Sequence, residues 1–187
     1  MAEVKQLKLQ QIYKEKAVPA LMKELGCKNI MQVPSIKKIV VNAGIGDFRG
    51  NKEAVEGFVN EFADISGQAP SPRKARKSES GFKIRQGDVV GYAVTLRGAR
   101  MWAFLDKLIN VVIPRVRDFR GLDPKALDKG GNYSIGIKEH TLFPEVNANT
   151  TKGVRSLQVT IVTTANNAEE SKKLLDLVGL PFKKEGK

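Results

Sequence analysis

The chain has 187 residues, 41% hydrophobic and 28% charged, a composition typical of a folded globular domain. Its single cysteine, Cys27, excludes an internal disulfide and is expected to be a small buried or half-buried hydrophobe, and its single histidine, His140, leaves almost nothing for a metal site. No apolar run is long enough to span a bilayer, and the first residues lack the apolar centre of a signal peptide. We therefore predict one domain over residues 1–187, in the cytoplasm, with no cofactor, metal or membrane partner.

The net charge of +12 is concentrated in the middle of the chain. Residues 69–120 contain twelve Lys or Arg against four Asp or Glu, so they carry +8 of the total. Such clustering indicates a polyanionic partner, because each phosphate that a cation neutralises releases counterions. A solvated basic face is the alternative, although a surface that serves only solubility usually mixes both signs.

The first elements in chain order are predicted to be a helix, a strand and a second helix. Residues 3–25, within an N-terminal helical segment 1–26, have mostly helical apolar spacing, with Pro19 as a kink and Gly26 as the stop. Residues 36–46, IKKIVVNAGIG, are typical of a strand that ends in glycines. The next helix begins at an Asn cap, Asn51, ends before Gly67, and has an apolar face made by Val55, Phe58, Val59 and Phe62.

The later elements are two strand and helix pairs with one more strand between them. Residues 89–98 alternate as a strand, with Val90, Tyr92, Val94 and Leu96 on one face, and residues 99–113 predict a helix that buries Trp102 and ends at Pro114. Residues 133–138 and 157–165 predict two further strands. The last helix has Asn167 as its cap and ends at Gly179.

This order predicts an α+β domain: a mostly antiparallel or mixed five-stranded sheet with helices on one face and the other face open. The residues that alternation assigns to the open face include no carboxylate, and hydroxyls, amides and cations are the groups that bond phosphates and ribose. An RNA-facing surface is therefore favoured, although Thr-rich strands are also common because Thr suits pleated sheets. The predicted members are Lys38, Asn42, Thr95, Arg97, Ser134, Lys138, Gln158, Thr160 and Thr164.

Two segments are predicted to be irregular. The basic loop, residues 69–88, holds six Lys or Arg between positions 73 and 87 and a single aromatic, Phe82. The loop of residues 114–133 has no periodicity and contains Arg115, Arg117 and Arg120 around Phe119. These arginines could bind phosphates while the ring stacks on a base, or the ring could instead pack into the core and hold the loop.

An enzyme is not expected. Gly44, Gly46 and Gly50 lie between a strand and a helix, as in dinucleotide-binding folds, but their spacing is loose and no strand ending in an acid follows. A turn that needs positive φ explains these glycines equally well. His140 has no second His or Cys to form a site, and its polar surroundings favour a surface contact.

Several separated motifs, in order, resemble bacterial large-subunit ribosomal protein five, and the resemblance covers nearly the whole chain. It implies an antiparallel sheet backed by helices that binds 5S rRNA in the central protuberance and also contacts 23S rRNA. The motifs are VPSIKKIVVNAGIGD, VTLRG, RMWAFLDKLI, PRVRDFRGL, GNYSIGIKE, FPEV and VGLPFKK.

The resemblance also implies site residues. The family's RNA-facing sheet uses an Asn, a Gln and a Thr that correspond to Asn42, Gln68 and Thr95. Asn42 and Thr95 also belong to the face predicted from alternation, whereas Gln68 comes from the resemblance alone. We add Lys38 and Arg97 of that face as 5S rRNA contacts. Weaker RNA contacts are expected at Arg115, Arg117, Arg120 and Lys138.

For the basic loop, the resemblance implies contact with the elbow of the peptidyl-site tRNA, through Arg73, Lys74, Arg76, Lys77, Ser78, Ser80, Phe82 and Lys83. It further implies an intersubunit bridge to small-subunit head protein thirteen and contact with other 5S rRNA-binding ribosomal proteins, on the cytoplasmic ribosome. Two loops depart from the family pattern, since Leu127 replaces an aromatic and Asn147 an acid. The alternative function is a general RNA chaperone or nonspecific cationic RNA binder.

Overall fold

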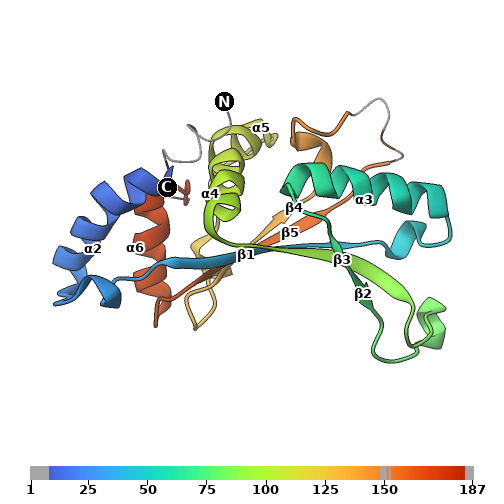
Figure 1. Cartoon of the computed structure of the whole chain (residues 1–187), viewed down its shortest axis with the longest axis horizontal. Helices are drawn as coiled ribbons and strands as arrows, with labels where there is room; N and C mark the ends of the chain where they lie inside the picture. The colour runs from blue at the N-terminus through green and yellow to red at the C-terminus, as the bar shows by residue number, and fades with distance from the viewer. Residues whose placement is uncertain (1–8, 148–150, 152, 184–187) are drawn as a thin grey trace. The chain divides into compact units, whose positions relative to one another are not determined.

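The computed structural model of the chain describes residues 9–147, 151 and 153–183. Its elements form the predicted α+β fold with a five-stranded antiparallel sheet, in the strand order β2-β3-β1-β5-β4 (Figure 1). None of the helices within the described ranges has the length and apolar character that a membrane span requires. The strands are β1 (Ile36–Gly44), β2 (Ser71–Lys74), β3 (Val89–Leu96), β4 (Tyr133–Ile137) and β5 (Leu157–Thr163).

One strand, β2, lies inside the segment that was predicted as the basic loop. It pairs antiparallel with β3, with Ser71 opposite Ala93, and the register shifts between Arg73 and Lys74. Its sequence, SPRK, has no apolar alternation and all four residues are exposed, so no local pattern indicates a strand. The hydrogen bonds to β3 therefore define it.

The chain groups into two compact units. The first comprises residues 1–39, 97–135 and 160–187, and the second comprises residues 40–96 and 136–159.

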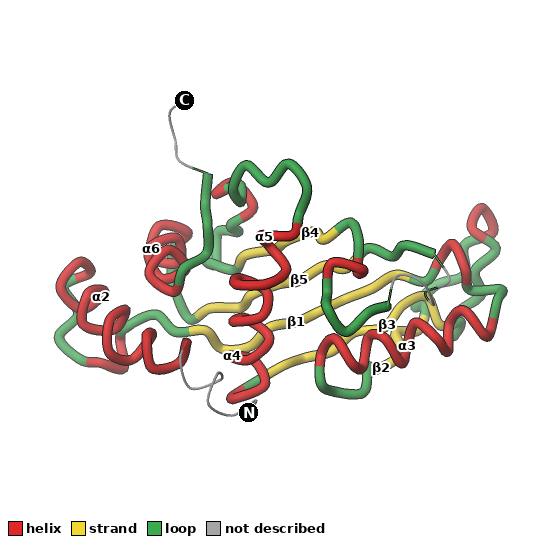
Figure 2. The backbone as a smooth tube through the Cα atoms, turned by 90° about the horizontal axis from the view of Figure 1, so that it is seen from above, coloured by secondary structure: helices red, strands yellow, loops and turns green. Residues whose placement is uncertain are grey.

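In the first unit, the helices pack around aromatic side chains. The helix that ends in α2 (Val18–Leu25) lies beside α6 (Ala168–Val178), as Figure 2 shows. The ring of Tyr13 lies 5.3 Å from that of Trp102 in α4 (Gly98–Lys107), and the Tyr13 hydroxyl donates to the Pro34 carbonyl at 3.0 Å. The partial burial of the Tyr13 side chain raises its pKa. Trp102 is buried, as predicted.

Both prolines that were expected to disturb helices in this unit follow a π-helical turn. Residues 13–17 form one such turn just before Pro19, and residues 108–112 form another just before Pro114 in α5 (Ile113–Arg115). A proline lacks the N–H of the regular helical bond and crowds the carbonyl four residues earlier, and the wider turn accommodates this. The helix therefore continues one residue past Pro114 and ends at Arg115, instead of ending at the proline. Of the predicted N-terminal helix, residues 3–8 lie outside the described residues.

In the second unit, α3 (Lys52–Ser66) packs on β3. The helix begins where the side chain of Asn51 accepts the Ala54 N–H at 3.2 Å, and it ends at Gly67, whose φ is +67°. Its buried face is made by Ala54, Phe58, Phe62 and Ile65, while the predicted Val55 and Val59 are only half-buried. Both predicted caps are thus confirmed, and the apolar face is rotated slightly.

Gly91 of β3 permits close contact between strands in the same unit. A Cβ atom at this position would lie 2.6 Å from the carbonyl oxygen of Ala43 in β1. Only glycine allows β1 and β3 to approach this closely.

Candidate nucleic-acid interface

In the second unit, polar residues of the strands line one face and apolar residues the other. Asn42 is exposed between buried Val41 and Ala43, and Thr95 is half-buried between buried Val94 and Leu96. Gln158 is exposed between buried Leu157 and Val159 in the same way, and Lys138 is exposed directly after buried Ile137. The alternation predicted these placements, but Val90 and Tyr92 are only half-buried and Ala93 is buried, so the alternation of β3 is regular only near its end.

Gln68, which sequence alternation does not find, directly follows the end of α3 and is half-buried. The Ser66 hydroxyl donates to the Gln68 carbonyl at 2.9 Å and also bonds the Phe62 carbonyl of the helix at 2.8 Å. The backbone at Gln68 is therefore fixed to the helix end. The Gly67 stop signal marks this turn in the sequence, but nothing local marks Gln68 as functional.

In the first unit, the strands also have an open polar face. The hydroxyls of Ser134 and Thr160 lie 3.1 Å apart, and those of Ser35 and Thr164 lie 3.3 Å apart. Lys38 is half-buried and Arg97 is exposed. None of the five strands contains Asp or Glu, so both units present hydroxyls, amides and cations without a carboxylate on their strands.

The basic hairpin, which we define as residues 71–93, extends from the second unit on the side away from α3 (Figure 1). Its tip is closed by two backbone bonds between Glu79 and Ile84, of 2.8 and 3.0 Å, and the Ser78 hydroxyl accepts the Gln86 N–H at 2.9 Å. The ring of Phe82 is 76% exposed at this tip. The six cations of the hairpin are all exposed: Arg73, Lys74, Arg76, Lys77, Lys83 and Arg85.

The segment of residues 114–133 is held by backbone bonds to a distant part of the first unit. Leu122 donates to the Pro181 carbonyl at 2.8 Å and accepts from Lys183 at 2.9 Å. The φ of Gly121 is +100°, and a Cβ there would lie 2.7 Å from the Lys183 backbone. Burial of the Tyr133 hydroxyl, together with the nearby negative charge of Asp123, raises the pKa of Tyr133 to about 12.

The arginines of this segment are exposed and its aromatic is neither fully buried nor fully free. Arg115, Arg117 and Arg120 are exposed, while Phe119 is half-buried, so neither predicted role of the ring is decided. In the loop around Leu127, where the sequence departs from the family pattern, Asp128 accepts the backbone and side-chain N–H groups of Asn132 at 2.6 and 2.8 Å. These bonds, chiefly the one from the Asn132 side chain, lower the pKa of Asp128.

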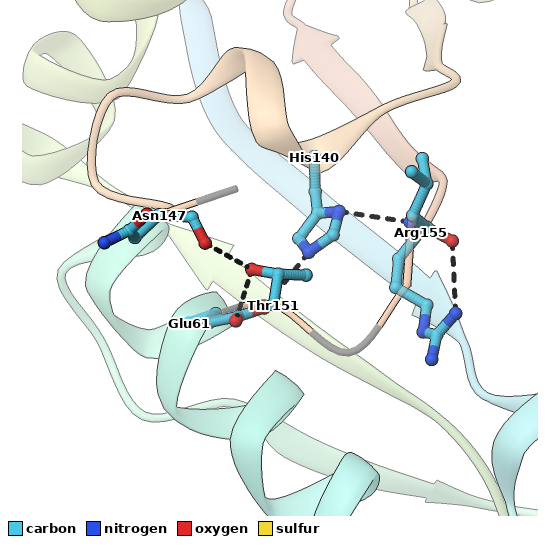
Figure 3. A network of polar contacts seen from close by, with 6 residues as sticks. Glu61, His140, Asn147, Thr151 and Arg155 are labelled. Carbon is cyan, nitrogen blue, oxygen red and sulfur yellow. Dashed lines mark hydrogen bonds and ion pairs between the residues drawn. The ribbon is translucent and has the colours of Figure 1, made fainter. Parts of the chain in front are cut away.

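His140 is not a surface contact, as its polar surroundings suggested, but is fully buried. Figure 3 shows its polar contacts with Glu61 and Arg155. Its Nδ1 accepts the Arg155 N–H at 3.1 Å, so its proton sits on Nε2, which lies 3.0 Å from the carboxylate of Glu61 in α3. The Thr151 hydroxyl donates to the same carboxylate at 2.7 Å. The network joins the segment after β4 to α3 and has a structural role. No group of acidic, His or Cys side chains within the described residues is arranged to hold a metal ion.

Two protein-family models together match most of the chain. A model of ribosomal protein L5 matches residues 29–85, and a second model, of the C-terminus of the same ribosomal protein family, matches residues 89–182. The chain is 53% identical over 172 residues to large ribosomal subunit protein uL5 of Thermotoga maritima, covering 92% of this chain and 94% of that protein. It is 49% identical over 176 residues to the uL5 protein of Syntrophomonas wolfei, covering 94% and 99%. The chain therefore belongs to the uL5 family, the non-enzymatic structural proteins of the large ribosomal subunit.

Proposed function

We propose that the open faces of the strands bind 5S rRNA and contribute contacts to 23S rRNA. The observation that carries this proposal is the absence of any carboxylate from the five strands, together with the full or partial exposure of the amide, hydroxyl and cationic side chains on their open faces. Phosphate and ribose groups accept hydrogen bonds from such side chains, and a carboxylate among them would repel the RNA backbone. The residues proposed to contact 5S rRNA are Lys38, Asn42, Gln68, Thr95 and Arg97.

The basic hairpin is proposed to contact the elbow of the peptidyl-site tRNA. A surface that accepts every tRNA in turn must recognise phosphates and shape and must release them. Exposed Lys and Arg side chains satisfy both requirements, and the exposed Phe82 offers one ring that stacks on any base. The residues are Arg73, Lys74, Arg76, Lys77, Ser78, Ser80, Phe82 and Lys83.

Further contacts complete the proposal. Arg115, Arg117, Arg120 and Lys138 are exposed and can bind additional rRNA phosphates. The chain is also proposed to contact other 5S rRNA-binding proteins and, in an intersubunit bridge, small-subunit head protein thirteen. The family resemblance alone supports these two protein contacts.

The test is a titration of the purified protein with 5S rRNA and with a structured RNA of equal length, at several salt concentrations. If the faces form a shaped site, 5S rRNA binds at least about a hundredfold more tightly, and the gap persists at physiological salt because it does not depend on charge alone. Equal affinities that fall together as salt rises would instead identify a nonspecific cationic RNA binder.

A further inference from the structure

Arg49 is a charged residue that the proposed function does not use. It lies in the turn between β1 and α3, the glycine-containing turn that resembles a dinucleotide-binding turn in sequence. Its guanidinium reaches the basic hairpin instead. Nη2 donates to the Lys83 carbonyl at 2.6 Å, and Nη1 lies 3.5 Å from the Asp88 carboxylate.

The two partners of Arg49 belong to different turns of the hairpin. Lys83 ends the tip, where its φ is +51° and its N–H bonds the Ser80 carbonyl at 3.0 Å. Asp88 closes the next turn, because its N–H bonds the Arg85 carbonyl at 3.1 Å and its carboxylate accepts the Arg85 N–H at 3.0 Å. One guanidinium therefore connects the tip of the hairpin to the start of β3.

The turn that carries Arg49 is itself held in place. The Phe48 ring packs edge-on against Phe58 of α3 at 5.7 Å, and the Arg155 guanidinium lies 3.8 Å from the centre of the Phe48 ring. On the other side of the turn, buried Ile45 donates its N–H to the Val90 carbonyl at 3.1 Å. Arg49 thus extends from a fixed backbone toward a hairpin that is exposed on nearly all sides.

Arg49 also changes the charge that the hairpin presents. Asp88 and Glu79 are the two carboxylates between residues 73 and 88. A phosphate that approaches the six cations is repelled by both of them. The guanidinium beside Asp88 offsets one of these negative charges without itself being among the exposed cations, since only 28% of its side chain is accessible.

We propose that Arg49 is a positioning residue of the basic hairpin, which fixes the tip against the start of β3 in the free protein so that the cations form a preformed RNA-binding surface. This inference rests on the proposed function only in assuming that the hairpin binds RNA. A guanidinium suits the task because its planar fork can hold a carbonyl and a carboxylate together, which a lysine ammonium does less well.

The first experiment measures amide hydrogen exchange in the free protein for the Arg49→Ala and Arg49→Lys variants. Lys52→Ala is the matched control, since it removes an exposed cation three residues away. We expect exchange at Ile84 and Gly87 to become about three- to tenfold faster in both Arg49 variants, and the Ile45 amide to be unaffected in all variants. Unchanged exchange in Arg49→Ala, or full protection in Arg49→Lys, would overturn the role of the guanidinium.

The second experiment measures affinity for a full-length tRNA transcript over a series of salt concentrations. Arg49→Ala is expected to weaken binding about three- to tenfold while the slope of log K against log salt stays unchanged, because a positioning residue neutralises no phosphate. A slope reduced by about 0.7–0.9 would show that Arg49 contacts a phosphate directly, and would refute a positioning role. Unchanged affinity would also refute a positioning role.

The two proposals fail in different ways. If the wild-type protein does not prefer tRNA to other RNA, the tRNA assignment fails. Both readouts on Arg49 still apply in that case, because the exchange experiment contains no RNA and the slope can be compared on any RNA that the hairpin binds.

Discussion

The open strand face of the second unit and the basic hairpin are both proposed to bind RNA, yet they are built in opposite ways. Asn42 and Thr95 alternate with fully buried residues, so their positions are fixed by the core beneath α3. The hairpin has two paired strands and a tip with few buried side chains, and it carries six exposed cations. The first surface offers a defined shape with little charge, and the second offers charge with a shape that depends on a few contacts. Specific recognition is therefore expected from the first and adaptable attraction from the second.

The largest effect is expected from a single methyl group placed at the base of the hairpin, where β3 also pairs with β1 of the open face, compared with the same group at the hairpin tip. Gly91→Ala places a Cβ 2.6 Å from the Ala43 carbonyl, so it should destabilise the protein by about 2–3 kcal/mol. Gly81→Ala at the hairpin tip meets nothing closer than the end of the Glu79 side chain at 4.0 Å, and should change stability by less than about 0.5 kcal/mol. Urea denaturation of both variants checks this, and equal losses would remove the distinction between a rigid and a tolerant region.

The second effect concerns affinity and uses a change of charge without a change of shape. Asn42→Asp replaces an exposed amide donor on the open face by a carboxylate, so it should lower the affinity for 5S rRNA about tenfold, or about 1.4 kcal/mol. Asn60→Asp, on the exposed side of α3, adds the same charge elsewhere and should change affinity less than about twofold. Filter binding at physiological salt compares them, and similar losses would mean that net charge, not the face, governs binding.

A smaller effect on 5S rRNA is expected when the hairpin loses charge. Lys74, Arg76 and Lys77 are exposed, so changing all three to Gln should leave the thermal midpoint within about 2 °C of wild type. The affinity for 5S rRNA should fall by about threefold or less, whereas the salt slope for tRNA should fall by about 2. If 5S rRNA binding is lost as severely as in Asn42→Asp, the division of labour between the two regions is wrong.

The smallest effect is expected in the loop of residues 127–133, which neither region contains. The pKa of Asp128 is lowered because Asn132 donates hydrogen bonds to its charged form. The charged carboxylate therefore stabilises the fold above the unfolded-state pKa of about 4, and this stabilisation is lost as pH falls through the lower folded-state pKa. Asp128→Asn should therefore lower the thermal midpoint slightly at pH 7 and not at pH 2. Calorimetry at both pH values measures this. A decrease that is equal at both would assign the effect to shape rather than to charge.

The sequence predicts those features that local patterns determine. Four strands, the Asn51 cap and the Gly67 stop follow from alternation and turn chemistry, and the structure confirms them. The exposure of Asn42 and Thr95 follows from the same alternation.

The features that the sequence misses depend on distant partners. β2 exists because β3 pairs with it, and the buried His140 is hydrogen-bonded to Glu61, 79 residues earlier in the chain. Neither partner can be read from the residues around the site. Gln68 was found by family resemblance and not by any local signal, and the part that Arg49 plays required the hairpin to be seen in three dimensions.

The pairing of Leu122 with Phe182 has a consequence for the order of events during synthesis. These two residues lie about 60 positions apart, so ribosomes that add roughly 5–20 residues per second make the second of them several seconds after the first. Until then Leu122 lacks the backbone partners that hold it, and Gly121 has no neighbouring chain to approach. The turn at Gly121 and Leu122 thus acquires its final backbone contacts only after the strands of the second unit have been made.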